Sequence, residues 1–104
     1  MFETLLKQVK QKCNITWHDD DTEARLTRIV KSAIPTLKHK LGISQNDFDF
    51  SEDGMENTLF LNYCFYEWNH ALNEFDDNYS NEIAQIRAKY EVQYYLSHED
   101  EDEE

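Results

Sequence analysis

Residues 49–54 have the ligand order of the first half of a calcium-binding loop. Asp49, Ser51 and Asp53 alternate with other residues and Gly54 follows them, and oxygen-bearing side chains in this order are typical of Ca²⁺ ligation. The bidentate acid of such a loop belongs at the twelfth position, which here is Phe60. Without that ligand we favour a polar turn that leads into a helix.

Two further groups contain metal-ligand residue types. Glu67 and His70 have the E-x-x-H spacing of di-iron bundles, but those sites need a second copy and two more inward-facing glutamates, and this chain has one copy. His18 precedes three aspartates at residues 19–21, which capping of a helix explains without an ion. We therefore expect no metal and no cofactor.

The common enzyme motifs are missing from the sequence. It has no glycine-rich phosphate loop, no G-x-S-x-G and no paired-cysteine motif. Cys13 and Cys64 are far apart and occupy apolar helical positions, which favours buried thiols over a disulfide or a metal site. We do not expect an enzyme.

The elements that position these residues are predicted to be helices. A chain of 104 residues suits one domain, and only 2 glycines and 1 proline are typical of an all-α protein. We predict a compact bundle of about four helices over residues 1–96, with one long loop at about residues 42–56 and a disordered acidic tail at residues 97–104. No stretch approaches the ~20 apolar residues of a membrane helix, so we expect a soluble intracellular protein without membrane contact.

The second predicted helix, residues 19–41, has the clearest boundaries. Asp20 and Glu23 form an acidic capping box at its start, and Gly42 can end it by adopting positive φ. Pro35 should kink this helix or divide it in two. Its apolar stripe consists of Leu26, Val30, Ala33, Leu37 and Leu41. The opposite side carries Arg25, Arg28, Lys31 and Lys38.

The other helices are predicted at about residues 3–13, 56–75 and 79–96. The third is apolar or aromatic almost all round, so it should be buried on all sides. Three short helices can hardly cover it. Its more polar side carries Tyr63, Tyr66 and His70, and the stripe of the last helix ends in Tyr90 and Tyr94.

The predicted loop contains two aromatic residues among acids. Phe48 and Phe50 alternate with Asp47, Asp49 and Ser51, which favours a loop that two phenylalanine rings pin to the core. A loop of this length in a compact domain is often functional.

Charge divides unevenly along the chain, which has a net charge of −12. Residues 1–41 carry 8 basic and 5 acidic side chains, whereas residues 42–104 carry 2 basic and 17 acidic ones. This acidity disfavours binding to a phosphate backbone. A basic patch that meets an acidic patch of the next copy favours head-to-tail contacts, which close into rings.

The order of these elements resembles the small helical head–tail connector (adaptor) proteins of long-tailed phages. The resemblance covers about residues 1–96, and it rests on the order of the elements more than on any single residue. Its first half rests on the N-terminal helix, on Asp19-Asp20-Asp21-Thr22 and on Leu26, Ile29, Ala33 and Leu41-Gly42. Its second half rests on the aromatic third helix, the Asn78-Tyr79 turn, Glu82-Ile83, Ile86-Arg87 and Tyr90-Glu91-Val92.

The resemblance implies a virion structural protein without cofactor or catalysis. Such a protein forms a homo-oligomeric ring, commonly a dodecamer, beneath the portal protein. It extends the DNA exit channel and is the platform for a stopper or tail-completion protein. DNA passes through without specific binding. The location is the head–tail interface of the virion, after assembly in the host bacterial cytoplasm.

Two sets of residues are predicted to act in this assembly. Acids that face the channel or its rim would repel phosphates and centre the duplex; they are Asp47, Asp49, Glu52 and Asp53. Contacts with a neighbouring copy or the portal are predicted for Arg25, Arg28, Lys31, Lys38, Tyr63, Tyr66, His70, Tyr90 and Tyr94.

Two other functions remain open from the sequence. The net charge of −12 and the small size also suit an acidic inhibitor that mimics DNA and binds a host DNA-binding protein. The third candidate is a helical assembly or scaffold factor that is absent from the mature particle.

Overall fold

The computed structural model describes residues 1–97, and this part of the chain is all-helical, as predicted. The predicted tail, apart from Ser97, lies outside the described residues. Ser97 itself is helical, although it was predicted to begin the tail. The elements are α1 (Phe2–Lys12), α2 (Asp20–Leu41), α3 (Met55–Trp68), a 3₁₀ turn (Leu72–Glu74), α4 (Phe75–Asn78) and α5 (Ser80–Ser97).

The residue that caps helix α2 lies one position before the predicted one. Asp19 is the capping residue, and its carboxylate accepts hydrogen bonds from the backbone N–H groups of Asp21 at 2.9 Å and Thr22 at 3.1 Å. Glu23 does not reach back to the cap, because it forms an ion pair with Lys10 of α1. The prediction of Asp20 and Glu23 as the box is therefore wrong, although the acidic start is correct.

The interior face of α2 forms much of the core. All five residues of the predicted stripe are buried, and Ile29 joins them. Pro35 lies within a single continuous helix, so α2 is not divided in two. One missing N–H on a helix with six buried side chains is outweighed by the packing of that face.

Helix α3 ends at Trp68, whereas the sequence predicted a helix to about residue 75. After Asn69 the chain turns through His70, which has φ of 58°. Helix α3 is also not buried on all sides, because Thr58 is exposed and Phe65 is only half-buried. Within residues 1–97, α3 packs against α1, α2, α5 and the 3₁₀ turn, and these neighbours leave part of its surface uncovered.

Three helices end in the same way, in a left-handed residue followed by an apolar one. Asn14, Gly42 and His70 all have φ between 57° and 72°. After each of them the next backbone N–H bonds the carbonyl five residues earlier, from Ile15 to Lys10, from Ile43 to Lys38 and from Ala71 to Tyr66. This is the Schellman arrangement, in which the apolar residue packs back on the helix. Ile15 and Ile43 are accordingly buried.

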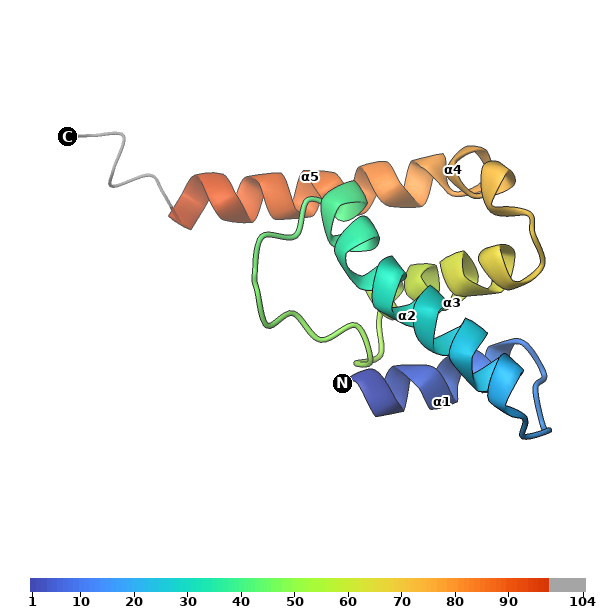
Figure 1. The fold of residues 1–104 in the computed structure, drawn as a ribbon. Coiled ribbons are helices and arrows are strands. Elements are labelled where there is room, and N and C mark those ends of the chain that lie inside the picture. The colour runs from blue at the N-terminus through green and yellow to red at the C-terminus, as the bar shows by residue number, and fades with distance from the viewer. Residues whose placement is uncertain (98–104) are drawn as a thin grey trace.

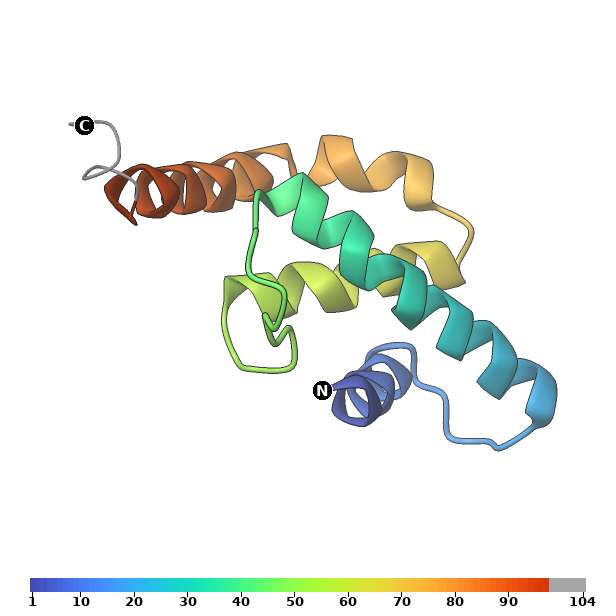
Figure 2. The same cartoon turned by 60° about the vertical axis from the view of Figure 1, so that its left-hand side comes forward.

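The helices form an elongated bundle with principal extents of 57 × 27 × 19 Å. Helix α1 lies along one edge and α5 along the opposite edge, with α2 and α3 between them (Figure 1). The C-terminal half of α5 extends beyond the rest of the bundle in both views (Figure 2). Arg87 fixes the other half by donating to the carbonyls of His39 at 3.3 Å and Lys40 at 2.9 Å.

The long loop spans residues 42–54 and is pinned to the core, as predicted. Phe50 is fully buried, with its ring centroid 4.9 Å from Phe48 and 5.0 Å from Phe60. Buried Asn57 donates to the carbonyl of Phe50 at 2.8 Å and to Gln8 of α1 at 2.9 Å. The loop is thus tied to both α1 and α3, which gives its acidic side chains defined positions.

Candidate interaction surfaces

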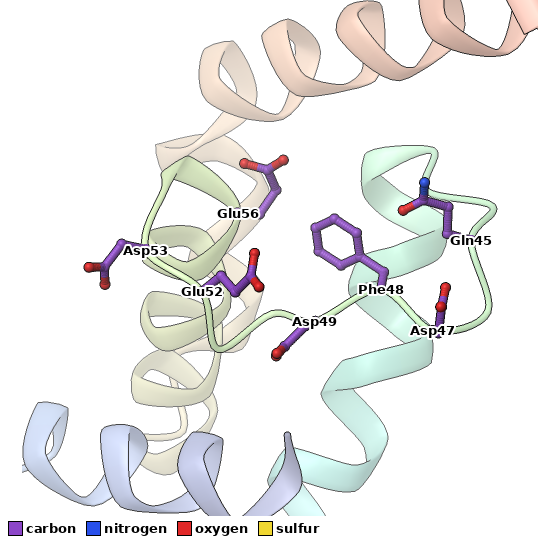
Figure 3. Close-up of a pocket in the computed structure, with 7 residues that line it drawn as sticks. All are labelled: Gln45, Asp47, Phe48, Asp49, Glu52, Asp53 and Glu56. Atoms are coloured by element: carbon purple, nitrogen blue, oxygen red, sulfur yellow. The ribbon is translucent and has the colours of Figure 1, made fainter.

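The four predicted rim acids gather around one depression, which we call the acidic hollow (Figure 3). Its volume is about 420 Å³. The loop supplies six of the lining residues and the first turn of α3 supplies the seventh. The lining consists of Gln45, Asp47, Phe48, Asp49, Glu52, Asp53 and Glu56.

Hydrogen bonds keep two of these acids ionised. The side chain of Ser51 donates to Asp49 at 2.5 Å and its backbone N–H donates at 2.8 Å, and these bonds lower the pKa of Asp49. Glu56 is half-buried, and burial raises its pKa. The hydrogen bonds from Lys89 at 2.7 Å and Tyr90 at 2.5 Å outweigh burial, so the pKa of Glu56 also lies below its ordinary value. The hollow is therefore negative at neutral pH.

The acids do not converge as metal ligands would. Asp53 points away from Phe48 and Glu56 (Figure 3), and residues 1–97 contain no group of three or more His, Cys, Asp or Glu side chains arranged to hold a metal ion. The E-x-x-H pair is also divided, because α3 ends between Glu67 and His70. The acids that line the hollow therefore form a patch of negative charge.

The four predicted basic contacts of α2 differ in their surroundings. Arg25 lies over the ring of Trp68 at 4.1 Å and donates to its carbonyl at 2.6 Å, so it closes the end of α3. Lys31 lies 5.7 Å from the ring centroid of Phe2. Arg28 is exposed and Lys38 is half-buried. Arg28 and Lys31 offer the most surface for a partner, whereas the half-buried Arg25 is engaged by the end of α3.

The predicted aromatic contacts also differ in how deeply their side chains are buried. Tyr63 is only 6% exposed and packs edge-on against Phe75 at 5.2 Å, so its ring lies within the fold. Tyr66 is half-buried and its hydroxyl accepts from Asn78 at 3.0 Å. The remaining three residues lie nearer the surface. His70 and Tyr94 are exposed, and Tyr90 is half-buried through its bond to Glu56.

A second apolar face on α5 was missed by the sequence analysis. Ile83 and Ile86 face the core, and Val92 and Tyr95 each follow one of them by nine residues. Nine residues make about two and a half helical turns, so Val92 and Tyr95 lie on the outer side. Both are exposed, together with Leu96. The spacing of residues 92, 95 and 96 could have revealed this face. The prediction for this helix used only the stripe that faces the core.

A second surface was also missed, at α1 and the segment after it. Leu6, Lys7, Ile15 and Trp17 line a groove of about 360 Å³, and Trp17 is 48% exposed. Its indole N–H donates to Thr22 at 3.1 Å, which holds the ring at the start of α2. This segment falls between the predicted helices at about residues 3–13 and 19–41, so no surface was predicted there.

No known protein family, curated protein or solved structure matches this chain. None of the described helices is long and apolar enough to cross a membrane. Function is therefore inferred from the acidic hollow, the basic side of α2, and the two apolar surfaces at α1 and α5.

Proposed function

We propose that the chain is a virion structural protein that forms a ring at the head–tail interface of a long-tailed phage. In this function the ring lies beneath the portal protein and extends the DNA exit channel. Its free side receives a stopper or tail-completion protein. The function is non-enzymatic, and the DNA slides through the ring without being bound.

The main support is the outer face of α5, where apolar side chains lie on a part of the helix that extends beyond the bundle. Grouped apolar residues on a projecting element are a mark of protein–protein association. Separate patches at opposite edges of a chain favour head-to-tail contacts, and these close into a ring when the rotation between copies permits. The all-helical fold agrees with the fold that the resemblance implies.

The acidic hollow supports the part of the proposal that concerns DNA. Loop acids on the wall of a channel would repel the phosphates of a passing duplex. Asp49 of the loop and Glu56 of α3, which also lines the hollow, have lowered pKa values, so both keep their charge at neutral pH. A channel lined in this way would not hold the DNA that it conducts.

Electron microscopy of the full chain mixed with a portal protein from the same genome tests the proposal. We expect a ring of this chain stacked coaxially on the portal ring. Mass spectrometry of purified virions should also find the chain, which separates a connector from a scaffold that leaves the particle. A chain that ignores the portal and is absent from virions would contradict the proposal.

The second candidate is an acidic DNA mimic, and the gathering of four acids at one hollow is the observation that favours it. Those acids lie on a single loop and one of them points away, whereas a mimic needs carboxylates spaced along a face. Competition with a DNA duplex for a basic DNA-binding protein of the host would support this candidate. Binding to the portal without such competition would support the connector.

A further inference from the structure

The outer face of α5 and the groove beside α1 are unpartnered surfaces of complementary character. We name Val92, Tyr95 and Leu96 the α5 tip; these side chains are 58%, 63% and 61% exposed. We name the depression lined by Leu6, Lys7, Ile15 and Trp17 the α1 groove. Both combine apolar side chains with charge at their margins.

The two surfaces differ in their charged side chains. Glu3, Lys7 and Lys10 line the α1 groove, and Lys10 is paired with Glu23, whereas Glu91 lies beside the α5 tip and the sequence beyond it continues into six acids at residues 99–104. Lys7 lines the α1 groove and has no ion pair or hydrogen bond within residues 1–97. An incoming acidic helix end would therefore find an available cation as well as apolar area.

Other hollows of the molecule suit the α5 tip less well. The hollow between α2 and α5 is lined by Lys40 and Arg87, but Lys40 is paired with Asp76 at 2.9 Å and Arg87 is bonded to two carbonyls of α2. Both cations are already used within the chain. The acidic hollow would repel the tip.

The two surfaces cannot meet within one chain. Helix α1 and the projecting end of α5 lie on opposite edges of the bundle in both views (Figures 1 and 2), and the molecule is 57 Å long. Contact between them requires a second copy. Such a contact joins unlike surfaces and is heterologous, so it can repeat from copy to copy.

We propose that the α5 tip of one copy docks in the α1 groove of the next copy, with Trp17 packed against the apolar side chains of the tip. This inference rests on the proposed ring-forming function and specifies the contact that builds the ring. The partner is a second copy of this chain, and the order of contact is head to tail.

Disulfide trapping between two single-cysteine chains tests the contact. In a Cys13→Ala, Cys64→Ala background, one chain carries Thr16→Cys beside the groove and the other carries Tyr95→Cys in the tip. A mild oxidant should link the mixed chains at least about tenfold faster than it links Tyr95→Cys to Ser44→Cys, an exposed loop position. Tip-to-tip links, or trapping no faster than this control, would overturn the proposal.

A chain with both new cysteines separates this inference from the proposed function. A ladder of products or a closed ring is expected when contacts repeat around a ring. Trapping that stops at two copies would retain the contact between tip and groove but contradict the ring. A ring that assembles on the portal without trapping would retain the function and overturn this contact.

A side-chain truncation, made in the chain with its native cysteines, tests the contact independently. Trp17→Ala should weaken self-association by about tenfold in sedimentation equilibrium, because tryptophan anchors carry much of the binding energy of an interface. Met55→Ala is the matched control, since Met55 is also a large apolar side chain, is 45% exposed and does not line the α1 groove. Equal affinity of the two variants, each verified as folded by circular dichroism, would contradict the role of Trp17.

Discussion

Arg25 and Arg28 lie on the same helix, three residues apart, but have different surroundings. The guanidinium of Arg25 donates to the carbonyl of Trp68 and stacks on its indole ring. Arg28 is exposed and has no hydrogen bond or ion pair within the described residues. We predict that Arg25→Ala lowers the free energy of unfolding by about 2 kcal/mol, through the loss of a charged hydrogen bond and a cation–π contact.

Arg28→Ala is the control for that prediction. It should change the free energy of unfolding by less than about 0.5 kcal/mol. Urea denaturation followed by circular dichroism measures both values. Equal stability of the two variants would show that the contacts of Arg25 add nothing to the fold.

Glu56 gives the fold a dependence on acid. Its pKa is lower in the folded chain than in the unfolded one, because Lys89 and Tyr90 bond the carboxylate. A lowered pKa contributes stability above the unfolded value, ~4.3, and this contribution is lost as the pH falls through the folded value. We predict that Glu56→Gln lowers stability at pH 7 by about 1–2 kcal/mol and flattens the loss below pH ~4.3.

Denaturant titrations between neutral and acidic pH test this effect. Tyr90→Phe keeps the carboxylate and the bond from Lys89 but removes the hydroxyl bond, so its pH dependence should lie between those of the wild type and Glu56→Gln. A Glu56→Gln variant with the same acid sensitivity as the wild type would exclude this contribution.

Among the elements, the long loop depends on one buried ring. Phe50 is fully buried between Phe48 and Phe60, so Phe50→Ala should cost about 3–5 kcal/mol. Phe48→Ala should cost less, because Phe48 is only half-buried. Urea denaturation measures both costs.

A milder variant tests the loop separately from global stability. Phe50→Leu should keep the fold but loosen residues 42–54, and an acid-specific protease should then cut after Glu52 faster than in the wild type. An unchanged cleavage rate would show that Asn57 and its hydrogen bonds hold the loop without the ring.

Local signals were sufficient to predict some elements and insufficient for others. Helix α2 was predictable because its stripe, its acidic start and Gly42 all lie within the segment itself. The end of α3 was not, because His70 takes the left-handed conformation that glycine usually marks, so the aromatic pattern continued past the real boundary. The α1 groove depends on Trp17 packing beside α1, which no periodicity in the sequence reveals.

The candidate site was predictable only in part, for a similar reason. The loop acids are close in sequence, so their gathering at one hollow followed from their spacing. The contacts of Arg25 and Tyr63 depend on partners more than ten residues away, and a helical pattern assigns a face without naming what covers it.

For the whole molecule, the exposed cations of α2 should matter for assembly and not for folding. We predict that the double variant Arg28→Glu, Lys31→Glu weakens ring formation, because each exposed pair that it removes contributes ~0.2–1 kcal/mol and reversal adds repulsion. The effect multiplies around a ring through multivalency. Sedimentation velocity and the yield of portal-bound rings measure it.

The neutral double variant Arg28→Ala, Lys31→Ala is the matched comparison and should be intermediate in assembly. Added salt should weaken assembly of the wild type more than that of the reversed variant, because mobile ions screen exposed charges. The melting curves of the isolated chains should coincide. Unchanged assembly of the reversed variant would remove these two residues from the contact surface.

Because half of α5 projects from the bundle, the thermal stability of the chain should depend on its concentration. Val92, Tyr95 and Leu96 in the last turns of α5 are exposed. If a neighbouring copy covers them, as we propose, it binds only the folded chain. By mass action, the temperature of half-unfolding should then climb as the sample becomes more concentrated. A dilute sample should unfold at a low temperature, whereas chains assembled in a closed ring should unfold only at a much higher one.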